Sequence, residues 1–453
     1  MDAQQGAVGG TDDRTEIDRV FAIQRENRWR VKNSTADERI GKLRRLREVV
    51  LEHADAVKAA LHADLRRVDP TGMAQEVLGV LGDIDDAIEH LAEWMEPTSY
   101  SPSPAYAGTA QQVRYEARGI VLLFGPWNFP FNLIFQPLVP IIAAGNTAIV
   151  KPNEMSPHTS AVVTAIIRQA FDESEVAVFE GGIELAQHLA ELPVDHVFFT
   201  GSPKVARIVM AGAAKHLASV TLELGGKCPA IVDHTTDLAA AAATIGLGKH
   251  YNAGQICLSP DHVWVHDEVK EEFLALYTEW IENNLYVDGE VNTAVFGRMV
   301  DRRNFRRVLD YVQDAVGRGA KLIGTGRSDE ESLTIHPTVL LDVPMDATVM
   351  QEEIFGPVLP VFGFSDPAQV VEHVREGGKP LAMYVFSTDQ GLVDRLIRET
   401  SSGGVTVNGW ASHYGEHQLP FGGVGSSGLG AYHSIHGFRE LSHARAVVAH
   451  PAE

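Results

Sequence analysis

Cysteine is scarce in this chain, and basic residues are outnumbered by acidic ones. Cys228 and Cys257 are the two cysteines among 453 residues, too few for a disulfide framework, which favours a reducing, cytoplasmic setting. The formal net charge of −22 disfavours nucleic acid and anionic membrane surfaces as partners. The composition therefore argues against a disulfide-stapled secreted protein and against a nucleic-acid-binding protein.

The pattern also lacks a leader sequence and an uninterrupted membrane span. Residues 1–16 are polar and acidic, without the basic and apolar regions of a signal peptide. The most apolar stretch, residues 119–150, contains prolines and asparagines that would leave backbone groups unpaired in lipid. We expect no membrane anchor, and we interpret this stretch as a buried strand, turn, helix and strand.

The length predicts more than one domain, because a single hydrophobic core rarely serves 453 residues. Thr35 and Glu38 form a capping-box pattern before apolar residues at helical spacing, and the first hundred residues read as mostly helical. Residues 101–108 are rich in proline, serine, glycine and alanine, which predicts an exposed connection.

From residue 119 short apolar runs alternate with helical segments. Strands are predicted over 120–124, 147–150, 176–179, 196–199 and 219–222, with helices over 157–171 and 203–217. Such alternation favours a parallel, doubly wound sheet. It resumes after Gly225, with a helix over 238–249 and a strand over 262–266, which indicates a second α/β domain.

A cysteine and a distant glutamate carry the first chemical signal. Cys257 follows a Gly254-Gln255 turn, and Glu223 lies at the end of an apolar run. A thiolate can attack a carbonyl, and a carboxylate can then activate the water that releases the acyl group. Read alone, Cys257 could instead be a small buried apolar residue.

Two turns at predicted strand ends suggest a nucleotide. Thr200-Gly201-Ser202 follows a strand and opens a helix, where free N–H groups bind phosphate, although a capped structural turn has the same pattern. Lys151 and Glu154 follow another strand, where an acidic residue often binds ribose hydroxyls, although an ordinary exposed turn could have the same sequence.

Asn128 lies in an apolar turn bounded by Pro126 and Pro130. An amide in a dry site can donate to a developing oxyanion. The alternative is that its side chain only satisfies a neighbouring carbonyl.

In combination, these motifs resemble the aldehyde dehydrogenase superfamily, and most closely its class 3 branch of short, often dimeric members. The resemblance runs from about residue 16 to the C-terminus. It rests on Pro126-Trp127-Asn128, Lys151-Pro152-x-Glu154, Phe199-Thr200-Gly201-Ser202, Leu222-Glu223-Leu224-Gly225-Gly226, Gly254-Gln255-x-Cys257, Glu353-Ile354-Phe355-Gly356-Pro357 and Leu419-Pro420-Phe421-Gly422-Gly423.

The resemblance implies catalytic roles. Cys257 matches the family nucleophile and Glu223 the general base, while Asn128 and the Cys257 backbone N–H match the oxyanion donors. Cofactor contacts are implied for Trp127, Lys151, Glu154, Thr200, Gly201, Ser202, Gly225, Glu353 and Phe355. Within that set, Lys151 and Glu154 match the adenosine-ribose contacts, and Gly201 and Ser202 the pyrophosphate turn. Glu353 matches the nicotinamide-ribose contact, and Phe355 the residue beside the nicotinamide ring.

An α/β fold in three parts is implied as well. We expect a Rossmann-like NAD(P)-binding domain from residues 1–94 and 117–222 and an α/β catalytic domain from 223–425. Residues 95–116 and 426–453 should form a small oligomerisation arm. Class 3 kinship implies a homodimer.

The expected reaction is oxidation of an aldehyde to the carboxylic acid. NAD should be preferred over NADP, because Glu154 would repel the 2′-phosphate, although class 3 relatives can use both. Aromatic residues (Trp127, Phe129, Trp410 and Tyr414) are candidate pocket walls, which favours an apolar aliphatic or aromatic aldehyde. The histidines, His413 and His417 among them, show no metal-ligand spacing, so no metal is expected.

The sequence departs from the family pattern in places. Ala206 replaces a frequent second glycine, Phe129 a frequent tyrosine and Leu247 an occasional tryptophan, while Cys228 stands where serine is common, which suggests a structural role. Two alternatives remain. A CoA-acylating relative would share Cys257 but would commonly lack Glu223, and a non-catalytic scaffold protein would be expected to lack the nucleophile.

Overall fold

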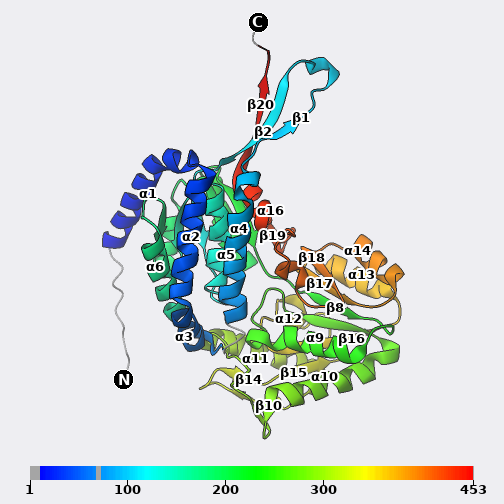
Figure 1. Ribbon diagram of the computed structural model, residues 1–453. Coiled ribbons are helices and arrows are strands. Elements are labelled where there is room, and N and C mark those ends of the chain that lie inside the picture. The colour runs from blue at the N-terminus through cyan, green and yellow to red at the C-terminus, as the bar shows by residue number, and fades with distance from the viewer. Residues whose placement is uncertain (1–10, 68–72, 452–453) are drawn as a thin grey trace.

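The computed structural model describes residues 11–67 and 73–451, with two sheets and a projecting arm (Figure 1). Residues 1–10 and 68–72 of the predicted cofactor domain lie outside the described residues, and so do residues 452–453 of the predicted oligomerisation segment. Within the described part of the chain, no helix is both long and apolar enough to span a membrane.

The first sheet is the predicted doubly wound one. Its six strands run in the order β19-β7-β6-β3-β4-β5, and all neighbours are parallel except β19, which is antiparallel to β7. The strands are β3 (Ile120–Phe124), β4 (Thr147–Lys151), β5 (Val176–Val178), β6 (His196–Thr200), β7 (Ser219–Glu223) and β19 (Gly428–Leu429). The predicted strands are confirmed to within a residue or two at each end.

Helices cover both faces of this sheet because its strands are apolar on both sides. Ile120, Leu122 and Phe124 of β3 pack with α1, α7 and α8, whereas Val121 and Leu123 pack with the helices of the opposite face. The helices of the first face are α1 (Thr11–Lys32), α7 (Ile183–Ala190) and α8 (Pro203–Ala214). Those of the other face include α2 (Ala36–Glu52), α4 (Gly79–Trp94), α5 (Asn132–Ala143) and α6 (Pro157–Ala170).

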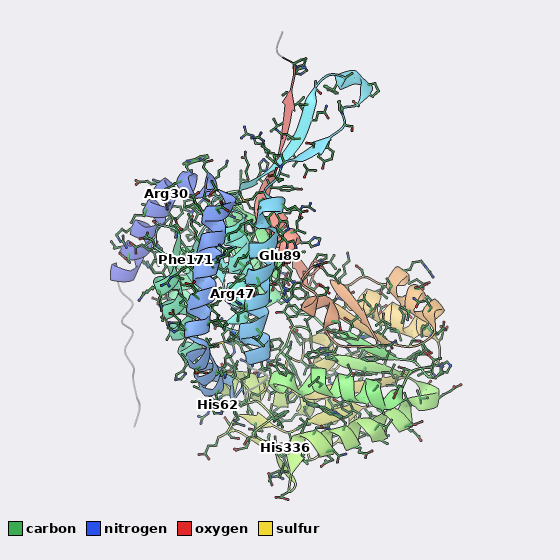
Figure 2. The ribbon with its side chains drawn as sticks, viewed as in Figure 1. Arg30, Arg47, His62, Glu89, Phe171 and His336 are labelled. Carbon is green, nitrogen blue, oxygen red and sulfur yellow. The ribbon has the colours of Figure 1, made fainter. Side chains whose placement is uncertain are left out.

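Helix α2 begins where the sequence predicts. The Thr35 hydroxyl accepts the Glu38 amide, and Glu38 in turn accepts the Thr35 amide at 2.7 Å, so the capping box is confirmed. Arg47 on α2, labelled in Figure 2, pairs with Asp85 of α4 at 2.7 Å and links the two helices at the surface.

The second sheet has seven strands in the order β12-β15-β16-β9-β8-β17-β18, parallel except for β12. Their bounds are β8 (Pro229–Val232), β9 (His262–His266), β12 (Lys321–Ile323), β15 (Thr338–Leu341), β16 (Val358–Phe364), β17 (Ala382–Phe386) and β18 (Gly404–Val407). The main helices beside it are α9 (Leu238–His250), α10 (Lys270–Leu285), α11 (Arg302–Gly317), α13 (Pro367–Glu376) and α14 (Gln390–Glu399).

A three-stranded antiparallel arm projects from the body (Figure 1). It consists of β1 (Thr98–Tyr100), β2 (Ala110–Ala117) and β20 (Ser442–Ala449). Residues 101–108, predicted as an exposed connection, join β1 to β2 and are exposed throughout. Pairing of β2 with β20 brings together the two sequence segments that were assigned to one arm.

Shorter elements complete the chain. They are α3 (Ala54–Leu65), η1 (Met73–Leu78), η2 (Pro104–Tyr106), η3 (Tyr251–Gly254), η4 (Asp267–Val269), β10 (Tyr286–Val287), β11 (Glu290–Val291), β13 (Ser328–Asp329), β14 (Thr334–Ile335), α12 (Thr348–Gln351), α15 (Ser412–Gly415) and α16 (Ser434–Glu440).

Candidate active site

The candidate site lies where the chain passes from the first sheet to the second. Glu223 is the last residue of β7, Gly225 and Gly226 lead to β8, and Cys257 precedes β9. Carboxyl ends of parallel strands are the usual ligand-binding edge of such sheets. Glu223 lies at this edge of the first sheet, and Cys257 lies across the junction, before the amino end of β9.

A run of left-handed backbone sets the position of Cys257. Asn252, Ala253 and Gly254 have φ values of 50°, 52° and 76° in η3. A side chain at Gly254 would overlap the carbonyl oxygen of Gly356, so this position requires glycine. The turn ends α9 and presents the half-buried Cys257 two residues after Gln255.

Side-chain amides hold this turn in place. Asn252 Nδ2 donates to the carbonyl oxygens of Asn128 at 3.1 Å and Gln255 at 3.2 Å. Gln255 Nε2 donates to the carbonyls of Asn252 and Arg298, both at 2.9 Å, and its Oε1 accepts the Val300 amide at 2.9 Å. The glutamine before the cysteine thus serves as a structural anchor.

Asn128 is buried beside the same loop. Its Nδ2 donates to the Gln255 carbonyl at 3.1 Å, which is the neighbouring-carbonyl contact considered from the sequence. An amide nitrogen has two hydrogens, so one remains for another acceptor. The buried Arg67 donates to the Asn128 carbonyl and to the Glu76 carboxylate, and these hydrogen bonds fix the backbone of Asn128.

The Cys257 thiol is in an environment that favours its neutral form. Burial raises its pKa above the usual range, and the carboxylates of Glu353 and Glu223 raise it further. Both glutamates therefore lie close enough to act on this thiol electrostatically. A proton must leave Cys257 before it can act as a nucleophile.

Glu223 is buried with both carboxyl oxygens unpaired. Neither oxygen accepts a hydrogen bond from the described residues. Burial raises the pKa of this carboxyl well above its ordinary value, with a further contribution from Glu440. A buried carboxyl with open lone pairs is suited to accept a proton or to hold a water molecule.

Glu353 approaches the other side of the junction. Its Oε1 accepts the Gly226 amide at 3.1 Å, and a side chain at Gly225 would overlap both of its oxygens. Burial raises the pKa of Glu353 to about 7. Glycine at position 225 therefore gives this carboxylate room beside the chain that follows Glu223.

Trp127 and Phe355 meet across the site. Their ring centroids are 5.4 Å apart in an edge-to-face arrangement, and Phe355 has a φ of 47°. Arg307 of α11 holds this unusual backbone by donating to the carbonyls of Glu353, Ile354 and Phe355 at 3.3, 2.9 and 3.4 Å. Arg307 was missed from the sequence, because an arginine in an amphipathic helix reads as a solvated residue.

Lys151 and Glu154 form an ion pair at the end of β4. The lysine is buried, whereas the glutamate side chain is 43% exposed. The Lys151 carbonyl accepts the Gly125 amide at 3.0 Å, which ties this strand end to the turn carrying Trp127 and Asn128. Lys151 and Glu154, the residues predicted to bind the nucleotide, are thus connected to the loop beside Cys257.

The Thr200-Gly201-Ser202 turn lies beside Glu223. Gly201 donates its amide to the Glu223 carbonyl at 3.0 Å, and Ser202 caps α8 by accepting the Val205 amide at 3.4 Å. The Thr200 hydroxyl oxygen is buried without a partner among the described residues. A Cβ at Gly201 would lie 2.7 Å from the Phe199 ring, so the packing of this ring requires glycine in the turn.

Apolar side chains are exposed next to this turn. Ile183 of α7 and Val205 and Ile208 of α8 are 69%, 44% and 65% exposed, and the two helices are in contact. Exposed aliphatic residues grouped beside a phosphate-type turn are typical of a surface that a planar ring can cover. This patch was not found from the sequence, because helical spacing alone does not show which apolar face lacks a neighbour.

Aromatic residues surround the segment after Cys257. Tyr384 and Trp410 both donate to the Leu258 carbonyl, at 2.6 and 2.9 Å. Tyr251 links this group to Phe129, with centroids 6.2 Å apart. Trp410 and Phe129 were expected as walls of the pocket, whereas Tyr251 and Tyr384 were missed because their proximity depends on the fold.

Cys228 and Lys249 are buried near the nucleophile. The Cys228 thiol donates to the Cys257 carbonyl and accepts the Ala382 amide, both at 3.3 Å. This geometry supports a structural role for Cys228. Burial lowers the pKa of Lys249, on the last turn of α9, to about 8.

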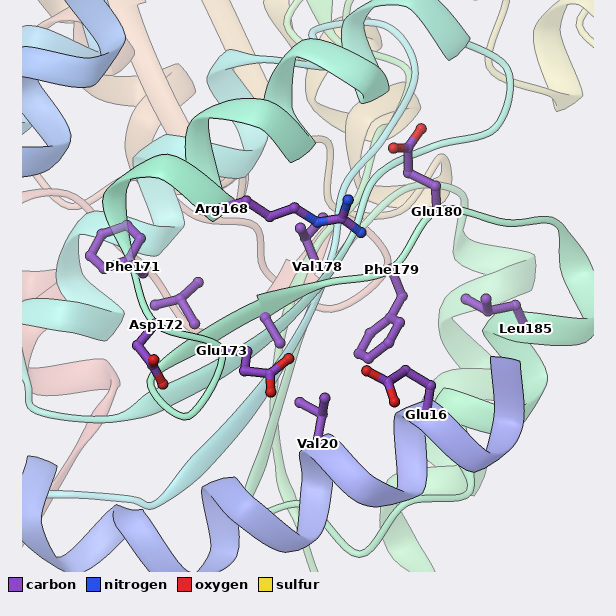
Figure 3. Close-up of a pocket in the computed structure, with 12 residues that line it drawn as sticks. Glu16, Val20, Arg168, Phe171, Asp172, Glu173, Val178, Phe179, Glu180 and Leu185 are labelled. Atoms are coloured by element: carbon purple, nitrogen blue, oxygen red, sulfur yellow. The ribbon is translucent and has the colours of Figure 1, made fainter. Parts of the chain in front are cut away.

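A separate pocket of about 470 Å³ lies at edge strand β5, between α1 and the end of α6 (Figure 3). Arg168 extends across it towards Glu180, with Glu16 and Glu173 on the opposite side. None of the predicted site residues lines it. Its lining includes no cysteine, so the candidate thiol chemistry lies at the junction around Cys257.

A doubly wound sheet joined to a second α/β sheet, with the buried Glu223 and the half-buried Cys257 at the junction, is typical of an oxidoreductase with two α/β domains. A model of the aldehyde dehydrogenase family matches residues 5–447. The chain belongs to the aldehyde dehydrogenase family.

Relatives agree with this assignment. The chain is 40% identical to "Aldehyde dehydrogenase family 3 member A2" of Macaca fascicularis, over 90% of this chain and 83% of the relative. It is 38% identical to "Aldehyde dehydrogenase, dimeric NADP-preferring" of Mus musculus, over 90% of this chain and 88% of the relative. The class 3 resemblance is confirmed.

A solved structure has the same fold. It is the substrate-bound state of Staphylococcus aureus AldH, with a TM-score of 0.92, 34% identity, and coverage of 96% of this chain and 94% of that one. The predicted α/β aldehyde dehydrogenase fold is therefore confirmed, and the chain is an oxidoreductase that acts on aldehydes.

Proposed function

We propose that this enzyme oxidises an apolar aldehyde to the carboxylic acid with NAD(P)+, through a covalent bond between the aldehyde carbon and Cys257. The observation that carries this proposal is the buried Glu223 carboxyl, whose two oxygens are unpaired within the described structure and which raises the pKa of Cys257. This arrangement leaves a proton acceptor beside a nucleophile.

The residues along the first sheet suit a dinucleotide. The pyrophosphate would bind at the turn formed by Thr200, Gly201 and Ser202, where the Thr200 hydroxyl is unpaired among the described residues. The adenine ring would lie over the exposed side chains of Ile183, Val205 and Ile208. Lys151 and Glu154 would hold the adenosine ribose. When bound, the nicotinamide group accepts the hydride that leaves the substrate carbon.

The other end of the cofactor has its own set of residues. Glu353 would accept hydrogen bonds from the nicotinamide ribose, and Gly225 leaves room for that carboxylate. Phe355 and Trp127, in edge-to-face contact, would restrict the nicotinamide ring. Arg307 acts as a positioning residue, because it holds the backbone of residues 353–355.

In the first chemical step the Cys257 sulfur bonds to the aldehyde carbon, and the carbonyl π electrons move to oxygen. The thiol proton passes to one of the two neighbouring carboxylates, Glu353 or Glu223, and from there to solvent, which leaves Glu223 free for the later hydrolysis. The second Nδ2 hydrogen of Asn128 and the Cys257 amide would stabilise the oxyanion, an effect worth roughly 10²–10³ in rate. Loss of the hydride then leaves a thioester.

Hydrolysis completes the cycle. Glu223 takes a proton from water, the resulting hydroxide adds to the acyl carbon, and the carbon–sulfur bond breaks with the electron pair returning to Cys257. The presence of Glu223 favours water over CoA as the acyl acceptor. The surrounding aromatic residues, Trp410 and Phe129 among them, favour an aliphatic or aromatic aldehyde.

Cofactor choice follows from Glu154. Its carboxylate would repel a 2′-phosphate, which favours NAD, but the ion pair with Lys151 reduces that repulsion. NADP is therefore proposed as a second, weaker cofactor, and the mouse relative is itself named NADP-preferring. A kcat/KM ratio that favours NADP would overturn this preference.

We assign residues 95–116 and 426–453 to oligomerisation, residues 223–425 to the catalytic domain, and the remaining segments to cofactor binding. Within 426–453, β19 joins the first sheet beside β7, and β20 forms the arm with β1 and β2. The arm exposes Tyr100 and Val448 on strands at the two edges of its sheet. A second copy pairing with these edges would give the proposed cytoplasmic homodimer. Light scattering that shows a stable monomer at micromolar concentration would contradict this.

The reaction can be tested with NADH formation from a panel of aliphatic, benzylic and cinnamyl aldehydes, with and without CoA. Cys257→Ala should lose turnover but keep NAD binding, whereas Cys228→Ala should retain turnover. CoA should not be needed. An inactive Cys228→Ala beside an active Cys257→Ala would show that the wrong cysteine was chosen, and strict CoA dependence would favour the acylating alternative.

A further inference from the structure

A group of metal-type ligands lies at the carboxyl edge of the second sheet. His234 follows β8, His266 ends β9, and Glu268 lies in η4. Because β8 and β9 are parallel neighbours, their ends bring the two histidines together, with ring centroids 4.6 Å apart. One ligand atom from each of the three residues lies within 4.8 Å of the others.

The ligand set suits a borderline transition-metal ion. Two imidazoles and one carboxylate can form three corners of a tetrahedron, and water can take the fourth. His234 and Glu268 are exposed and His266 is half-buried, so an ion could reach them and the side chains can rotate. Neighbouring ligand atoms around zinc lie about 3.4 Å apart, so a small rotation would close the site.

A second, independent feature orients His234. Its Nδ1 lies 2.9 Å from the carboxylate of Asp233, which is buried. Asp233 is held by the hydroxyls of Thr235 at 2.6 Å and Ser387 at 3.0 Å. With Nδ1 next to this fixed carboxylate, Nε2 is the His234 nitrogen left for an ion, and carboxylates beside metal-bound histidines commonly act in this way.

The η4 turn brings in the third ligand. The Glu268 amide donates a long hydrogen bond of 3.4 Å to His266 Nδ1, which places Glu268 beside the ring; an ion bound to this nitrogen would replace that hydrogen bond. The Glu268 carboxylate would supply the negative charge that two neutral imidazoles lack. The sequence did not predict this site, because its ligands come from two strands and only the parallel pairing aligns them.

We propose that His234, His266 and Glu268 bind a divalent transition-metal ion of the zinc type, separate from the oxidoreductase site. Cys257 precedes β9, whereas His266 is its last residue, and a five-residue strand spans about 16 Å. The ion would tie the carboxyl ends of β8 and β9 together. It would stabilise the folded chain without taking part in aldehyde oxidation.

The test uses the tag-free, metal-stripped full chain with Zn²⁺, Co²⁺ or Mg²⁺ in calorimetric titrations and thermal unfolding. Because Cys257 can also bind soft metals, each titration is repeated with Cys257→Ala. We expect one Zn²⁺ per chain in both proteins, a visible-region spectrum for Co²⁺ without a sulfur charge-transfer band, and no binding of Mg²⁺.

Variants of the two histidine ligands show whether Zn²⁺ binds at this specific site or adventitiously elsewhere on the surface. His234→Ala and His266→Ala should each lower Zn²⁺ affinity at least tenfold and remove the metal-dependent rise in Tm, with metal-free activity unchanged. Asp233→Asn should weaken binding about 10–100-fold. His443→Ala, an exposed histidine on the arm, is the control and should bind as wild type. Equal binding by all these variants, or none by wild type, overturns the proposal.

Discussion

Replacing Glu223 by glutamine separates the acid–base role of this residue from its structural one. The side chains have nearly the same shape, so Glu223→Gln should fold normally. The native carboxyl is buried with no hydrogen bond to either oxygen among the described residues, and burial raises its pKa. Removing a buried ionisable group should therefore leave the thermal stability unchanged or higher.

The catalytic effect should be large. Loss of a general base costs about 10²–10⁴ in rate, which corresponds to about 2.7–5.4 kcal/mol of barrier. If Glu223 chiefly activates water, Glu223→Gln still acylates Cys257 and releases one burst of NADH before turnover stalls. Stopped-flow NADH formation, with quenched-flow detection of the acyl-enzyme, measures the two phases separately.

Glu353→Gln is the matched control. Its carboxylate contacts the Gly226 amide, and we expect it to position the nicotinamide ribose. This variant should slow hydride transfer and remove the burst. A full burst with stalled turnover in Glu353→Gln, alongside near-normal turnover in Glu223→Gln, would refute the reasoning and transfer the role of base to Glu353.

Further predictions concern the turn before Cys257 and a histidine outside it. Gly254→Ala should lower the free energy of unfolding by at least about 1–2 kcal/mol, the cost of a left-handed backbone, because a Cβ there also overlaps the carbonyl of Gly356. Gly41→Ala, in an open helical position, should instead raise the free energy of unfolding by about 0.5–1 kcal/mol, and urea unfolding measures both. His417 hydrogen-bonds Asp83, which raises its pKa, so its stabilising effect should be present below pH 6.5 and be lost as pH rises through the raised pKa. Unfolding of wild type and His417→Gln across this range tests it, and a difference that grows with pH would contradict the assignment.

The sequence predicted the strands and the turns at their ends well, because those signals are local. The apolar run before Glu223 and the glycine before Gln255 need no partner to be recognised. In the structure these positions became a strand end and a left-handed turn. Their shared location did not follow from a local rule: Glu223 lies at the carboxyl end of β7, whereas the turn before Cys257 lies at the amino end of β9, and only the junction of the two sheets brings them together.

The residues that hold the site in shape could not be found in this way. Arg307 lies on a strongly amphipathic helix, yet it serves three backbone carbonyls far along the chain. Tyr384 lies in a buried strand, where a tyrosine reads as core, but its hydroxyl is bonded to the Leu258 carbonyl. Contacts of this kind are set by tertiary packing and leave no pattern in the local sequence.

The electrostatics around Cys257 connect the two glutamates in one proton balance. Each carboxylate raises the pKa of the thiol, while burial raises the pKa of each carboxyl. Three negative charges cannot be held together in so dry a site, because each would oppose the next. A thiolate at Cys257 is therefore favoured when one of the two glutamates takes up the departing proton. The protonation states of Cys257, Glu223 and Glu353 depend on one another, so the three groups titrate together.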